Sequence, residues 1–208
     1  MADALINPEI LEPLVARVQD LAAGADGRVI VGIAGKPGVG KSTLAQALVA
    51  ALDHAAYLPM DGFHLADVEL DRLGLLDRKG APETFDAQGY GALLERVAAG
   101  ESVWAPGFER ALEQPIAQSI PIEKHARIVI TEGNYLLLPA WHRARAQLTE
   151  CWYVQLDDDV RLRRLIWRHV EFGKTPLAAQ DWVRRTDEPN ASLVGEHAGL
   201  ADLVISLD

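Results

Sequence analysis

Short apolar runs recur along the chain and predict the strands of a β-sheet. Each is five or six residues long, and most are rich in β-branched or aromatic side chains, which favours buried strands of a parallel sheet. The runs lie at 29–34, 55–60, 127–131, 151–156 and 202–206. The segments between them have helical character. Alternating strands and helices predict an α/β fold, a doubly wound, mostly parallel five-stranded sheet with helices on both faces.

Helix signals stand at both ends of this pattern. An apolar stripe before the first run predicts an N-terminal helix, which Asn7 is placed to cap. Pro13 is expected to kink or restart this helix, because proline lacks a backbone N–H. After the fourth run we expect helices at 157–170 and 175–186, and Asn190 is expected to cap a further one.

The first apolar run leads into a glycine loop that fits G-x-x-x-x-G-K-[ST] at every fixed position. A helix is expected directly afterwards, so strand, loop and helix stand in the order that this phosphate-binding motif requires. The glycines allow successive N–H groups to surround an anion, and the helix adds the positive end of its dipole. A chance glycine turn is the alternative, which this context disfavours. The expected nucleotide-binding residues are Gly35, Lys36, Pro37, Gly38, Val39, Gly40, Lys41, Ser42 and Thr43.

Charged and hydroxyl groups at the strand ends supply the chemistry. Lys41 is expected to reach the β and γ phosphates of ATP during catalysis, and the Ser42 hydroxyl is expected to ligate Mg²⁺. Asp61 follows the second run and Glu132 follows the third, and ligands bind at this edge of open α/β sheets. One carboxylate can accept a proton from, or orient, an attacking hydroxyl, and the other can hold Mg²⁺ directly or through water. The alternative for Asp61 is a cap for the turn at Gly62.

Composition narrows the classes of function. The formal net charge of −10 argues against a protein that grips nucleic acid. A single cysteine, Cys151, excludes an intrachain disulfide, disfavours a cysteine-based metal site and is expected to pack in the core. No apolar run approaches a membrane span and the first residues lack a secretory pattern, so we expect a cytoplasmic protein without membrane partners. The oligomeric state stays open, with a homodimer as one option.

Positive charge is concentrated in 157–174, a segment that we expect to form a lid. Arg161, Arg164 and Arg168 stand at i, i+3 and i+7, and so share a helix face. Phosphoryl transfer needs positive charge over the transferring group. We therefore expect Arg164 to act in catalysis and Arg164 and Arg168 to bind ATP. The alternative is a solvated basic face that pairs with the aspartates at 157–159.

The region 62–126 contains no run that must belong to the main sheet. We interpret it as an insert that binds the acceptor, within one domain that spans residues 1–208. A helix is expected at 86–99, and the segments 103–108 and 119–122 are expected to form a small hairpin or a lid edge.

Four motifs follow the phosphate loop: MDGFH at 60–64, DRKGAPETFD at 77–86, PGFER at 106–110 and TEGNY at 131–135. Together with the loop they resemble the phosphoribulokinase / uridine kinase / bacterial pantothenate kinase superfamily. The greatest similarity is to a branch labelled fructose transport system kinase or fructokinase. The resemblance covers the chain from Arg28 to Ile205 and implies a P-loop kinase fold that uses ATP and Mg²⁺.

The resemblance also implies roles for single residues. Asp61 matches a catalytic base, and Glu132 matches an acidic residue near Mg²⁺. Uridine kinases usually have Tyr-Asp and a downstream His where this chain has 108–112, FERAL, which disfavours a nucleoside acceptor. His64 either contacts the acceptor or packs under the insert. The acceptor-binding residues expected are Asp61, His64, Arg78, Lys79, Phe108 and Arg110.

The expected function is that of a small-molecule kinase, which transfers the γ-phosphoryl group of MgATP to an alcohol group. The acceptor is expected to be a small anionic or polyhydroxylated molecule: fructose fits the resembling branch, and pantothenate fits the cations. A P-loop NTPase switch or metallochaperone is the alternative from another class. The N-K-x-D guanine motif and the Cys/His cluster that such proteins need are both absent from the sequence.

Overall fold

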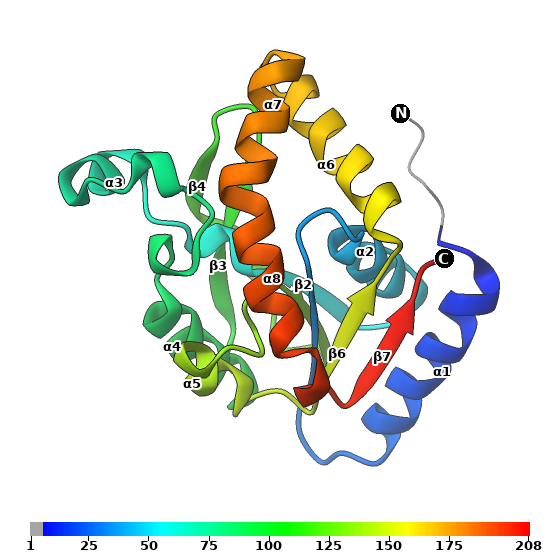
Figure 1. The fold of residues 1–208 in the computed structure, drawn as a ribbon. Coiled ribbons are helices and arrows are strands. Elements are labelled where there is room, and N and C mark those ends of the chain that lie inside the picture. The colour runs from blue at the N-terminus through cyan, green and yellow to red at the C-terminus, as the bar shows by residue number, and fades with distance from the viewer. Residues whose placement is uncertain (1–5) are drawn as a thin grey trace.

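The computed structural model describes residues 6–208, and a parallel five-stranded sheet in the order β2-β5-β1-β6-β7 forms its centre (Figure 1). Every pair of neighbouring strands is parallel. The predicted α/β sheet is therefore confirmed. Its strands are β1 (Val29–Gly35), β2 (Ala55–Pro59), β5 (Ile128–Glu132), β6 (Glu150–Gln155) and β7 (Leu203–Ser206).

Helices cover both faces of the sheet, because alternate residues of its buried strands point to opposite sides. On one face, Val31 and Ile33 of β1 pack with α1 (Pro8–Ala23) and α2 (Lys41–Ala51). On the other face, Ile30 belongs to a core that also contains residues of α4 (Ala87–Ala98), α5 (His142–Arg145) and α8 (Glu188–Glu196). Cys151 is buried in this second core, as expected.

The insert carries a short helix and a separate two-stranded sheet. Helix α3 (Asp67–Leu73) projects from the body on the side opposite α1 (Figure 1). Strands β3 (Val103–Glu109) and β4 (Gln114–Ile122) form the predicted antiparallel hairpin. Strand β4 begins five residues earlier than predicted. The sequence does not indicate these first residues as a strand, because most of them are exposed and they lack an apolar alternation.

The C-terminal helices differ from the prediction. After α6 (Asp158–Glu171), helix α7 (Pro176–Trp182) passes through a π-turn (Val183–Asp187) directly into α8, so one long helical segment replaces two separate helices (Figure 1). Asn190 lies inside α8 and is buried, so its prediction as a cap is wrong. Pro189 stands in the first turn of α8, directly after the π-turn, where a missing backbone N–H is tolerated.

The N-terminal helix is capped as predicted but does not restart. Asn7 Oδ1 accepts a hydrogen bond of 3.1 Å from the Glu9 N–H, and α1 continues through Pro13. One proline removes a single backbone hydrogen bond, which the packed apolar face of α1 outweighs. Within residues 6–208, no helix is both long and apolar enough to cross a membrane.

Candidate active site

The glycine loop between β1 and α2 has the conformation of a phosphate cradle. Gly38 and Gly40 have φ values of 85° and 102°, in the left-handed region that favours glycine. A Cβ on Gly38 would also lie 3.1 Å from the Arg161 carbonyl oxygen. No side chain caps the N-terminus of α2, which leaves its first N–H groups available to an anion.

Lys41 is held inside the loop with its ammonium group nearly out of reach of solvent. It is 7% exposed, and its Nζ donates a hydrogen bond of 3.1 Å to the Lys36 carbonyl oxygen. Burial lowers the pKa of Lys41 to about 8, although Glu132 and Asp61 oppose this change. The buried ammonium has lost much of its hydration, so phosphate oxygens that bind beside it would stabilise its charge.

The predicted metal pair, Ser42 and Glu132, is brought together. Ser42 Oγ donates to Glu132 Oε1 at 3.0 Å, and the Tyr57 hydroxyl donates to the same oxygen at 2.8 Å. Burial and the neighbouring Asp61 charge raise the pKa of Glu132, and Lys41 and the two hydroxyl donors counteract them. Tyr57 was not predicted, because within an apolar strand it resembles a core residue.

Asp61 lies in the 3₁₀ turn Met60–Phe63 beyond β2 and forms an ion pair with Arg110, which follows β3. Burial alone would raise the pKa of Asp61, but Arg110 and the other nearby cations hold it below its usual value. Gly62 makes this meeting feasible: a Cβ there would lie 2.1 Å from the Pro106 carbonyl oxygen of β3. The glycine therefore lets the hairpin backbone rest on the Asp61 turn.

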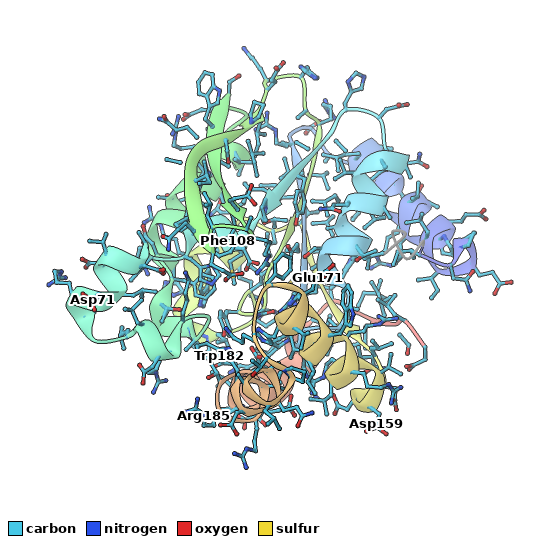
Figure 2. All side chains as sticks on the ribbon, turned by 90° about the horizontal axis from the view of Figure 1, so that it is seen from above. Asp71, Phe108, Asp159, Glu171, Trp182 and Arg185 are labelled. Atoms are coloured by element: carbon cyan, nitrogen blue, oxygen red, sulfur yellow. The ribbon has the colours of Figure 1, made fainter. Side chains whose placement is uncertain are left out.

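The lysine, the serine, the two carboxylates and the arginine described above line a common cavity of about 330 Å³ beyond the strand ends. Figure 2 shows Phe108 of the hairpin on one side of this region and Trp182 of α7 on another. Of the loop residues, Pro37, Gly38, Lys41 and Ser42 line the cavity. The remaining predicted loop residues frame it without lining it: Gly35, Lys36, Val39, Gly40 and Thr43.

His64 and Phe108 form the aromatic wall of the cavity. The His64 ring lies at a tilt to the rings of Phe85 and Phe108, with centroid distances of 3.9 Å and 4.8 Å. Its Nδ1–H donates to the Asp61 carbonyl oxygen at 2.8 Å, which leaves Nε2 as a hydrogen-bond acceptor. Burial lowers the pKa of His64, which favours this neutral form.

Arg78 and Lys79, which are neighbours in the motif at 77–86, have different surroundings in the structure. Lys79 lines the cavity, donates to Asp67 Oδ1 at 2.5 Å and also donates to the Glu113 carbonyl oxygen. Arg78 does not line the cavity, and it pairs with Glu83 at 2.5 Å on the surface. The structure places Arg78 away from the other predicted acceptor-binding residues, and its acceptor-binding role stays a prediction.

The lid arginines have three different environments. Arg161 is 1% exposed, pairs with Asp158 and Glu188 at 2.7 Å each, and donates to the Pro37 carbonyl oxygen. It ties α6 to α8 and to the phosphate loop. Arg168 lines the cavity, whereas Arg164 is exposed and does not. The buried residues of α6 are Arg161 and Leu165, and Arg164 points away from them, so its role in catalysis and ATP binding stays a prediction.

Several cavity residues were not predicted. They come from the N-terminus of α3, the hairpin loop, the C-terminal part of the 157–174 segment and the helical segment after it: Asp67, Glu113, His169, Lys174, Trp182 and Asp187. No periodicity marks these positions, because their approach depends on how the lid helices pack against the sheet.

The glycine loop, with two carboxylates at the neighbouring strand ends, is typical of a P-loop kinase. The chain belongs to the phosphoribulokinase / uridine kinase family, whose model matches residues 30–205. This confirms the predicted resemblance. The chain is an ATP-dependent phosphotransferase that acts on an alcohol group.

Relatives within this family carry different names. A Schizosaccharomyces pombe protein named "putative uridine kinase" is 34% identical over 86% of this chain and 83% of its own length. A Nocardioides pantothenate kinase is 34% identical over 53% of this chain and 36% of its own length. A crystal structure from Silicibacter sp. TM1040, named "putative fructose transport system kinase", has a TM-score of 0.83 at 36% identity, over 92% of this chain and 98% of that one.

Proposed function

We propose that this kinase transfers the γ-phosphoryl group of MgATP to a hydroxyl group of a polyhydroxylated, sugar-like metabolite. The observation that carries the proposal is the position of Asp61. Its carboxylate lines the same cavity as Lys41 and Ser42 on the phosphate side and as His64, Phe108 and Arg110 on the insert side. A hydroxyl beside Asp61 would therefore face phosphates held by the loop, as in-line transfer requires.

The phosphate side has the donors that ATP needs. The loop N–H groups and Lys41 would hold the β and γ phosphates, and Arg168 would place a further cation over the transferring group. Arg168 has no ion-pair partner in the described part of the chain. The Ser42 hydroxyl and Glu132 carboxylate are oxygen ligands of the kind that Mg²⁺ prefers, so they fit the ion. Bound there, Mg²⁺ would neutralise charge on the phosphate oxygens.

Asp61 would orient the acceptor hydroxyl and take its proton. The Arg110 partner keeps Asp61 ionised near neutral pH, and an ionised carboxylate can only accept hydrogen bonds. Arg110 also lies 4.9 Å from the Phe108 ring centroid, so the same side chain fixes the base and the aromatic wall. The hairpin thereby couples acceptor binding to the position of the base.

The charge pattern of the acceptor side favours hydroxyl groups over a strongly anionic ligand. Arg110 is paired with Asp61, and Lys79 is paired with Asp67. Paired charges offer neighbouring donors and acceptors, which suit the hydroxyl groups of a polyol, and the flat Phe108 ring suits the apolar face of a sugar. Fructose is our first candidate, which the name of the Silicibacter structure also supports.

Pantothenate is a second candidate, and Lys174 is the observation that favours it. Its Nζ lies 4.6 Å from the Trp182 ring centroid in the cavity wall, and the described residues supply it with no carboxylate partner. That ammonium could receive a carboxylate. Relatives named pantothenate kinase match about half of this chain.

The test is an ADP-release assay with MgATP and single acceptors: fructose, other ketoses and aldoses, pantothenate, and uridine. We expect a sugar to raise ADP release well above the rate without acceptor, with a mass increase of one phosphoryl group in that sugar. Activity with pantothenate alone would favour the second candidate. Activity with uridine alone would contradict the proposal.

A further inference from the structure

The π-turn between α7 and α8 brings into the cavity a residue that the proposed transfer step does not involve. A π-turn inserts an extra residue into a helix and often marks a functional position. Here it spans Val183–Asp187. Val183 is buried, whereas Arg184 and Arg185 are exposed. Asp187, the last residue of the turn, lines the same cavity as Asp61.

Asp187 is held in place from the lid. His169 Nε2 and Asp187 Oδ2 lie 2.8 Å apart, with side-chain exposures of 18% and 14%. Because a carboxylate accepts, Nε2 carries the proton and donates it to this hydrogen bond. The structure gives Asp187 Oδ1 no partner among residues 6–208, and no buried side-chain polar atom in that part lacks one. Oδ1 is therefore accessible, on a side chain that lines the cavity.

The Asp187 carboxylate lines the same cavity as Asp61 and Arg168. Burial and Arg110 lower the pKa of Arg168, while Asp61 and Asp187 both oppose this change, so Arg168 is close to both carboxylates. Trp182, on the turn of helix before Asp187, also lines this cavity. The cavity thus contains a second oriented acceptor group that does not contact the phosphate loop.

We propose that the His169–Asp187 pair binds an acceptor hydroxyl other than the one that is phosphorylated. The free Oδ1 accepts this hydrogen bond, and His169 keeps the carboxylate oriented. The proposal deepens the proposed function and rests on it, because it requires an acceptor with at least two hydroxyl groups. It makes Asp187 a specificity-determining residue that selects polyols over simple alcohols and disfavours an anionic group at that end.

The competing interpretation is that the pair only fastens α6 to α8. The substitution Asp187→Asn distinguishes the binding role from the structural role. An amide oxygen can still accept the hydrogen bond from His169, but the negative charge of the carboxylate is lost. Asp181→Asn is the matched control: the same change on the preceding helix, at an exposed residue that pairs with Arg184 and lies outside the cavity.

The experiment first identifies the best acceptor of the wild-type enzyme in the ADP-release panel, which decides the proposed function separately. Both variants are then assayed with that acceptor and with analogues that each lack one hydroxyl. Loss of a hydrogen bond to a charged group predicts an acceptor KM about 10- to 100-fold higher in Asp187→Asn. We expect an unchanged KM for MgATP and an unchanged melting temperature. The deoxy analogue that lacks the hydroxyl bound by Asp187 should bind the wild-type enzyme and Asp187→Asn equally weakly.

Three results would overturn the inference. Asp187→Asn could match Asp181→Asn, it could raise both KM values together, or every deoxy analogue could remain as sensitive to the substitution as the parent acceptor. A wild-type enzyme that phosphorylates only acceptors with a single hydroxyl would overturn the proposed function and this inference together. A polyol-active wild-type enzyme with an unaffected Asp187→Asn variant would overturn the inference alone.

Discussion

Gly62→Ala is the substitution for which the structure gives the sharpest expectation. Gly62 has an ordinary backbone conformation, so the requirement for glycine comes from space alone. An added Cβ would meet the Pro106 carbonyl oxygen at 2.1 Å and its carbonyl carbon at 2.5 Å, whereas ordinary contacts begin near 3.4 Å. Both atoms are backbone. The hairpin must therefore move away from the Asp61 turn by about 1 Å.

The size of the effect follows from this displacement. Overpacking of this kind costs about 1–3 kcal/mol, and each kcal/mol lowers the melting temperature of a domain of this size by about 2–4 °C. Arg110 follows β3 directly, so the shift also pulls its guanidinium away from Asp61. A misplacement of about 1 Å in an active site can cost about 10²-fold in rate.

The assay compares kcat, both KM values and the melting temperature of Gly62→Ala with those of Gly199→Ala. A Cβ on Gly199 meets nothing within 4 Å, so this control adds the same methyl group without a clash. We expect a large loss of kcat and a higher acceptor KM in Gly62→Ala only, with the KM for MgATP nearly unchanged. If the two variants behave alike, the close approach of hairpin and turn is not needed for catalysis.

Two further predictions concern the phosphate side. Burial lowers the pKa of Lys41 to about 8 without nucleotide, and bound phosphates would raise it. MgATP binding should therefore take up a proton and weaken as the pH rises above about 8. A nucleotide Kd that stays constant from pH 7 to 9.5 in calorimetry would contradict this. Tyr57→Phe removes one donor from Glu132 and should raise the Mg²⁺ requirement about tenfold, with the acceptor KM unchanged. An unaltered Mg²⁺ titration would show that Tyr57 does not orient Glu132.

Much of the site followed from the sequence, because local rules govern it. The phosphate loop needs only a strand, glycines and a helix in order. Asp61 and Glu132 meet because the ends of parallel strands share one edge of the sheet, which topology alone ensures. Ser42 and Glu132, both predicted as Mg²⁺ ligands, lie in contact at this same edge.

The rest depends on packing that no local pattern encodes. Arg164 and Arg168 are alike by spacing, and only the rotation of α6 on the sheet determines which one faces the cavity. Lys79 and Arg78 are neighbours, yet one is turned inward by Asp67 and the other outward by Glu83. Asp187 reaches the cavity through a π-turn, which shifts the helical period that sequence reasoning assumes.

The central claim is that phosphate passes from ATP to an acceptor hydroxyl beside Asp61. The most direct measurement uses ATP labelled with ¹⁸O in its γ-phosphoryl group and follows the label by mass spectrometry, for the wild-type enzyme and Asp61→Asn. We predict label in a phosphate ester of the acceptor, at a rate that Asp61→Asn lowers by about 10²-fold, the lower end for loss of a general base, while ATP binding is kept. Label found only in inorganic phosphate, at a rate independent of the acceptor and of Asp61, would contradict the account.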